Sequence, residues 1–253
     1  MQATTIDDVL SILPGIVDDT RSRRDPLGYF AALYRQVTIE VKKGIDGGVF
    51  DDGPRMSRFD ASFANAYLAA YETFNAGGRP SGAWGFAFER ARSGTPIILQ
   101  NLLLGINAHI NLDLGVVTGT AFRGSELPGF RADYDRLNAI LAALVPRVRA
   151  VVEGFSPRLG ELTELGGPTA ELALRFSVET ARDDAWLAAT VISVTPRDFR
   201  GAAIDVLDGK AKLLGRIVAD QPEPAATVVR HIRDAESTDV GAIITALDGI
   251  ARP

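Results

Sequence analysis

Cysteine is absent from this chain of 253 residues. Its absence excludes disulfides, thiol nucleophiles, iron–sulfur clusters and every zinc site with a cysteine ligand. Histidine is nearly absent too, because the chain contains only His109 and His231. A zinc site built from three histidines is therefore excluded as well.

Several familiar catalytic motifs are also missing. The sequence has no P-loop, no glycine-rich dinucleotide loop after a strand, no Gly-x-Ser-x-Gly and no His-Glu-x-x-His. It also has no Asp-Asp-x-x-Asp stretch of the kind that holds a diphosphate and magnesium. These gaps argue against nucleotide-dependent chemistry and against serine hydrolases of the familiar kinds.

The charge balance bears on partners and location. The net charge is −5, from 27 basic and 32 acidic side chains, and this argues against a nucleic-acid partner. The first residues lack a basic stretch and place Asp7 and Asp8 just before the first apolar residues, so we expect no signal peptide. We therefore expect a cytoplasmic protein.

The chain carries frequent signals for helix starts. Asp25-Pro26, Thr95-Pro96 and Thr195-Pro196 each pair a good N-cap with proline at the first helical position, and Ser57 with Asp60 resembles a capping box. No run alternates apolar and polar residues as a strand would. The pattern predicts an all-α fold with helices over 6–17, 26–43, 58–75, 82–92, 96–117, 129–145, 169–194, 197–219 and 225–249, the last of them broken.

The best candidate for a domain boundary is the glycine- and proline-rich stretch 154–168. It is short, and it contains Leu159, Leu162 and Leu165, which favours a packed connection over a linker. We therefore predict one helical domain over 1–253, with 154–168 as the place where a subdivision would fall.

The segment 96–117 stands out, because it is apolar around most of its circumference. Its hydrophobicity also fits a membrane span. However, several polar residues would make insertion costly, and there is no second span. We therefore predict a buried central helix and no membrane partner. The polar residues are Gln100, Asn101, Asn107, His109, Asn111 and Asp113.

These polar residues form two sets on nearly opposite faces of the helix. Gln100, Asn107 and Asn111 share one face, and His109 and Asp113 share the other. His109 and Asp113 are four residues apart, close enough to hydrogen-bond. A carboxylate beside an imidazole orients its tautomer and raises its pKa, while burial lowers that pKa. Such a pair suits a general base, but buried amides and histidines also serve as structural ties.

The segment Leu102–Leu114, LLLGINAHINLDL, resembles the signature of the bacterial family known as domain of unknown function 5995. Supporting pieces are the helix from Met56 through Phe59-Asp60 to Tyr67-Leu68, Trp84 with Phe88, and Trp186. The resemblance covers most of residues 25–220 and supplies no activity. It implies an all-helical domain in which six residues belong together, namely Asp60, Tyr67, Asn107, His109, Asn111 and Asp113.

The leading hypothesis is an enzyme without a cofactor that performs acid–base chemistry on a small, largely apolar molecule between helices. Such chemistry covers isomerases, cyclases and lyases. His109 is the expected acid/base with Asp113 orienting it, and Asn107 or Asn111 would bind a substrate oxygen. Only one of the two faces can serve the pocket. The remaining expected contacts are Asp60, Phe63, Tyr67, Trp84 and Trp186.

Two other interpretations stay open. A metal-dependent hydrolase would hold one divalent metal on His109, Asp113 and a second carboxylate, either Asp60 or Glu89. A non-catalytic module would bind a small molecule or a partner and use the polar helix only for structure. The sequence is also compatible with a homo-oligomer. His231 lies between Arg230 and Arg233, which favours a surface position over a ligand role.

Overall fold

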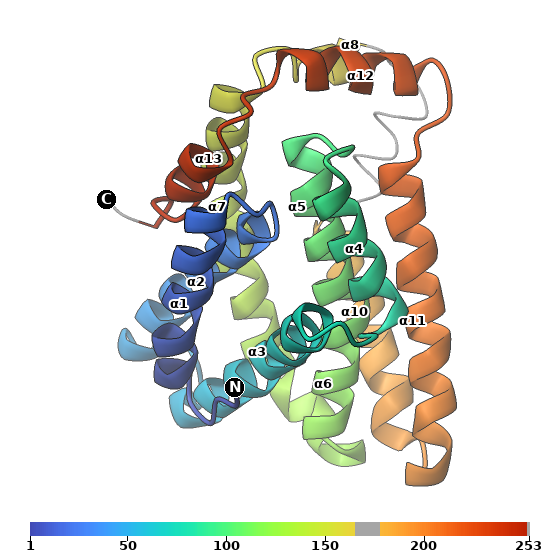
Figure 1. Cartoon of the computed structure of the whole chain (residues 1–253). Coiled ribbons are helices and arrows are strands. Elements are labelled where there is room, and N and C mark those ends of the chain that lie inside the picture. The colour runs from blue at the N-terminus through green and yellow to red at the C-terminus, as the bar shows by residue number, and fades with distance from the viewer. Residues whose placement is uncertain (165–177, 252–253) are drawn as a thin grey trace.

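The computed structural model describes residues 1–164 and 178–251, and every regular element in these ranges is helical (Figure 1). The predicted all-α class is confirmed. The α-helices are α1 (Ile6–Arg23), α2 (Gly28–Asp46), α3 (Gly53–Asn75), α4 (Gly82–Ser93), α5 (Ile98–Ala108), α6 (Gly115–Ala121), α7 (Arg131–Phe155), α8 (Glu161–Glu164), α10 (Val178–Val194), α11 (Arg197–Ala219), α12 (Ala225–Ala235) and α13 (Val240–Leu247). A π-helix, η1 (His109–Leu114), joins α5 to α6, and a 3₁₀-helix, η2 (Gly124–Phe130), precedes α7.

The predicted buried helix is the centre of the bundle. It runs without a break through α5, η1 and α6, and it contacts α2, α3, α4, α10 and α11 (Figure 1). By length and composition it could cross a membrane, but 78% of its most apolar window is buried inside the fold. Neighbouring helices therefore cover the apolar surface that makes the segment stand out in the sequence.

Glycine on this central helix permits very close packing. A Cβ atom at Gly119 would lie 2.5 Å from the backbone oxygen of Ala189 on α10. A Cβ at Gly105 would meet the ring of Phe30 on α2 at the same distance. Real Cβ contacts are not this short, so the present packing requires glycine at both positions.

The predicted helix starts at Pro26 and Pro96 are each two residues too early. α2 and α5 begin at Gly28 and Ile98, so Pro26 and Pro96 lie before the first helical residue. The predicted start of the helix over 197–219 is confirmed, since α11 begins at Arg197, although Pro196 is its N-cap and not its first helical residue. At the first of these starts, Asp25 Oδ1 accepts the backbone N–H of Leu27 at 3.1 Å. That bond stabilises a turn just before the helix. An aspartate followed by proline suits such a turn as well as a helix N-cap, so the pair did not locate the first helical residue.

The predicted capping box at Ser57 is also wrong. α3 begins at Gly53 with Asp52 as N-cap, and the side chain of Asp52 accepts the N–H of Arg55 at 2.8 Å. Ser57 therefore lies inside the helix, where its hydroxyl accepts the N–H of Ile6 at 3.1 Å. Asp60 is left without a cap to serve and is buried.

The C-terminal half follows the predicted pattern with longer or divided helices. α7 extends ten residues past the predicted end at 145, and the predicted 225–249 helix divides into α12 and α13. The stretch 154–168 contains a short helix, α8, which contacts α12 (Figure 1). Leu159 packs against the core as expected. Leu165 and the predicted helical residues 169–177 lie outside the described residues, and the single domain stays a prediction.

Candidate active site around His109

A π-helical turn holds the two titratable residues of the central helix. His109 begins the π-helix and Asp113 lies within it, and both side chains are buried. π-turns within longer helices are rare and are found frequently at functional sites. The His109 ring faces α2 and α3, and the Asp113 carboxylate meets Trp84 of α4.

His109 and Asp113 form the expected hydrogen bond. His109 Nδ1 donates to Asp113 Oδ2 at 3.0 Å, and Trp84 Nε1 donates to the same oxygen at 2.8 Å. Burial lowers the pKa of His109 below its ordinary value and raises the pKa of Asp113, while their shared hydrogen bond opposes both shifts. With Nδ1 bound to the carboxylate, a neutral imidazole presents a lone pair at Nε2.

Aromatic rings enclose the imidazole on several sides. Phe63 stacks on it with ring centroids 3.7 Å apart and planes at 9°, and Tyr34 meets it edge-on at 4.6 Å. The rings of Phe30, Trp84 and Tyr67 follow at 5.6, 6.1 and 6.5 Å. Water is therefore kept from the ring by side chains that α2, α3 and α4 contribute.

Four buried polar atoms in this enclosure have no hydrogen-bond partner among the described residues: Tyr34 OH, Asp60 Oδ2, Tyr67 OH and His109 Nε2. The charges of Asp60 and Asp113 add to burial in raising the pKa of Tyr34, so the carboxylates lie within electrostatic range of its hydroxyl. Burial also raises the pKa of Tyr67, and it raises that of Asp60 to about 7. Each unpaired buried atom costs roughly 1–3 kcal/mol of stability.

The amide residues on the opposite face have partners. Asn107 Nδ2 donates to the carbonyl of Ala211 at 2.7 Å, and Asn111 Nδ2 donates to Asn107 Oδ1 at 3.1 Å. Gln100 Nε2 donates to the carbonyl of Val218 at 2.8 Å. The bonds of Asn107 and Gln100 tie the central helix to α11, and Asn111 supports Asn107. This face therefore has a structural use and lies away from the enclosure.

Trp186, a predicted substrate contact, and Glu89, an alternative metal ligand, both lie away from His109. Trp186 is half-buried on α10, where its ring is 4.9 Å from that of Tyr134 and lies under the guanidinium of Arg131. Glu89 is exposed on α4, so it cannot share a metal with the buried pair. Among the described residues, no three His, Asp or Glu side chains are grouped to hold a metal ion. His231 is exposed, as predicted.

Tyr34 and Phe30 were not predicted for the site. Both lie on the buried face of α2, spaced four residues apart, and nothing in that spacing distinguishes a site residue from an ordinary core residue. The only signal in the sequence is the tyrosine itself, because a buried hydroxyl needs a partner.

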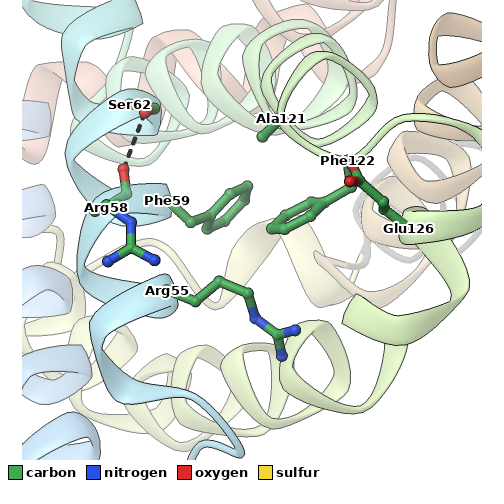
Figure 2. Close-up of a pocket in the computed structure, with 7 residues that line it drawn as sticks. All are labelled: Arg55, Arg58, Phe59, Ser62, Ala121, Phe122 and Glu126. Atoms are coloured by element: carbon green, nitrogen blue, oxygen red, sulfur yellow. Dashed lines mark hydrogen bonds between the residues drawn. The ribbon is translucent and has the colours of Figure 1, made fainter.

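One cavity in the structure lies apart from His109. It has a volume of about 540 Å³ and lies between α3 and the segment that follows α6 (Figure 2). Phe59 forms part of its wall and stacks on Phe63 at 6.2 Å, and Phe63 in turn covers His109. Two phenylalanine rings therefore stand between the cavity and the imidazole. The lining residues are Arg55, Arg58, Phe59, Ser62, Ala121, Phe122 and Glu126.

Comparison with known proteins gives one match. The profile of a family of unknown function, DUF5995, matches residues 6–221, which include the whole central helix and every residue of the enclosure. No curated protein and no solved structure is significantly similar to the chain. The resemblance predicted from the LLLGINAHINLDL segment is therefore confirmed, and the chain belongs to the DUF5995 family.

Proposed function

We propose that this protein is an enzyme that performs acid–base chemistry without a cofactor on a small, largely apolar molecule held beside His109. One observation carries the proposal. The polar groups of the amide face have hydrogen-bond partners within the protein, whereas four buried polar atoms around His109 have none among the described residues. The fold pairs the polar groups on the amide face of the central helix but leaves those around His109 unpaired. This difference favours a ligand as the missing hydrogen-bond partner around His109.

His109 Nε2 is the proposed base. Asp113 holds the imidazole through Nδ1, and Trp84 holds the carboxylate of Asp113. That carboxylate stabilises the imidazolium that forms when Nε2 takes a proton from the substrate. The surrounding rings keep water away from the reacting atoms, which strengthens each of these interactions.

Tyr34 and Tyr67 are the proposed donors to a substrate oxygen. Their raised pKa values keep both hydroxyls protonated at neutral pH, as a donor to a carbonyl or a developing oxyanion requires. In this role they replace Asn107, whose amide bonds α11, and Asn111, whose amide bonds Asn107.

Asp60 is the proposed second proton carrier. A carboxyl with a pKa of about 7 exchanges its proton near neutral pH, so it could return a proton at a second atom of the substrate. Removing a proton at one atom and delivering one at another is an isomerisation, and cyclisation or elimination needs the same two groups. We place this activity in the cytoplasm, in keeping with a central apolar helix that is covered within the fold.

The test starts from native mass spectrometry of protein purified gently from the cells that produce it, with metal counted in the same sample. We expect an organic molecule of low mass bound without stoichiometric metal. Once the molecule is identified, its hydrogen exchange in D₂O is followed by NMR with the wild-type protein, His109→Gln and Asn107→Ala. We expect His109→Gln to slow exchange by about 100-fold or more, because general acid–base groups contribute rate factors of this size.

The Asn107→Ala variant is the matched control on the same helix. It should lose stability, because the bond to Ala211 is removed, and keep exchange within a few-fold of wild type. Exchange at the wild-type rate in His109→Gln would overturn the proposal. About one metal ion per chain, lost on substitution of His109, would favour the metal-dependent hydrolase instead.

A further inference from the structure

The two faces of α3 serve different spaces. Asp60, Phe63 and Tyr67 face the enclosure around His109, whereas Arg58, Phe59 and other residues of the helix line the 540 Å³ cavity (Figure 2). A cavity of this volume lies within the range that holds small organic ligands. The acid–base proposal does not use this cavity.

The cavity presents hydrogen-bond donors with positive charge. In the part of the chain that the structure describes, the Arg58 guanidinium makes no ion pair or hydrogen bond, and the side chain is exposed at the cavity. Arg55 bonds Asp133 at 2.6 Å through Nη2, but its Nε is buried and has no partner among those residues. The guanidinium fork suits a planar carboxylate, which can accept two parallel N–H bonds.

One acidic side chain lies at the same cavity and must be weighed. Glu126 Oε2 accepts the backbone N–H of Arg123 at 3.1 Å, at the start of η2, so part of its charge is used to cap that helix. Arg55 and Arg58 lie on α3, on the other side of the Phe59 and Phe122 rings from Glu126 (Figure 2). The α3 side of the cavity is therefore the cationic side, in a protein whose net charge is −5.

Aromatic rings supply the apolar wall. The rings of Phe59 and Phe122 point toward each other with centroids 5.9 Å apart (Figure 2), and both contact Phe130, at 4.7 and 4.1 Å. Phe130 is fully buried and supports the other two rings. The three rings therefore offer a firm surface to a flat apolar group.

We infer that this cavity binds a small organic carboxylate with a flat apolar body. The carboxylate pairs with the exposed guanidinium of Arg58, and the apolar body lies against Phe122. A single unpaired guanidinium beside an aromatic wall matches one anionic group on one ring system, and it does not match the repeated phosphates of a nucleic acid. The inference does not depend on any chemistry at His109.

The test uses 2-naphthoate and its uncharged analogue 2-naphthylmethanol, titrated into the full-length protein by calorimetry at low salt. We expect 2-naphthoate to bind at least tenfold more tightly than the alcohol. Arg58→Gln should weaken 2-naphthoate binding at least fivefold and leave the alcohol unchanged. Arg79→Gln removes the same charge from an exposed residue after α3 and should match wild type. Phe122→Ala should weaken both compounds.

Three results would overturn the inference: no binding of 2-naphthoate at millimolar concentration, equal affinity for acid and alcohol, or equal effects of Arg58→Gln and Arg79→Gln. Circular dichroism of each variant separates a lost site from a lost fold. His109→Gln should bind 2-naphthoate as wild type does, and a loss there would show that the cavity is not separate from the enclosure. The acid–base proposal can therefore fail while this one stands.

Discussion

At the scale of single residues, some buried polar side chains in this fold have hydrogen-bond partners within the protein, and others have none among the described residues. Gln36 is of the first kind, since its amide donates to Asp248 at 3.0 Å and accepts the N–H of Ala251 at 3.0 Å. Thr20 is another, because its hydroxyl donates a hydrogen bond to the carbonyl of Ile16. Tyr67 and Asp60 are of the second kind, buried without such partners among the described residues. Natural proteins accept that cost most often where function requires it.

Tyr67→Phe provides a test of this distinction. The substitution removes a buried hydroxyl that has no partner in the described fold, so we expect the free energy of unfolding to stay the same or rise by about 1 kcal/mol. Tyr134→Phe is the matched control, because its hydroxyl donates to the carbonyl of Arg182 at 2.7 Å, and its loss should cost about 1 kcal/mol. Urea denaturation measures both values. Equal losses in the two variants would mean that Tyr67 is bonded within the fold.

Asp60 should make stability depend on pH. Its pKa in the folded protein is about 7, above the ordinary value of 3.8, so the folded state keeps a proton that the unfolded state releases. The stabilisation is fully present below about pH 4 and is lost as pH rises through 7, by an amount on the order of 4 kcal/mol.

Urea denaturation of wild type and Asp60→Asn at pH 5 and pH 8 measures this loss. The neutral amide cannot titrate, so wild type should lose stability relative to Asp60→Asn between the two values. Asp18→Asn, at an exposed position, should leave the difference between pH 5 and pH 8 as in wild type. A pH dependence that is the same in Asp60→Asn and wild type would contradict the burial of this carboxyl.

At the scale of elements, the helical wheel correctly separated the two polar faces of the central helix. Asn107 bonds α11, Asn111 bonds Asn107 on the same face, and His109 pairs with Asp113. The π-helical turn between His109 and Leu114 was not predicted, because it arises from how six consecutive residues pack and has no sequence signature of its own. The starts at Pro26 and Pro96 were misplaced, since a capping residue can equally serve a turn before the helix.

The contact of α6 with α10 should be intolerant of any side chain. We expect Gly119→Ala to lower the free energy of unfolding by about 3 kcal/mol, because the new methyl group would lie 2.5 Å from a backbone oxygen that cannot move alone. Gly201→Ala is the control in an exposed part of α11, where nothing lies within 4 Å of the added carbon. It should raise stability by about 0.5–1 kcal/mol. Thermal denaturation compares the two, and a neutral Gly119→Ala would contradict this packing.

At the scale of the whole molecule, the sequence predicts the fold class and the His109–Asp113 pair, but it does not predict all the residues that surround that pair. Helical periodicity is local, so it locates the central helix and the His109–Asp113 pair. Tyr34 joins that pair from a helix some seventy positions earlier, and only tertiary packing brings the two together. The same limit explains Trp186, whose aromatic character suited a pocket wall and whose place beside Tyr134 could not be read from the chain.

The whole chain also makes one direct measurement simple, because His109 and His231 are its only histidines. Two-bond ¹H–¹⁵N correlation spectra of protein labelled at histidine report the tautomer and charge of each ring, with exposed His231 as the internal reference. We predict that at pH 7 His109 is neutral, with its proton on Nδ1 toward Asp113 and a free lone pair on Nε2. An imidazolium at pH 7, or a proton on Nε2, would contradict it, because His109 would then have no base to offer a substrate.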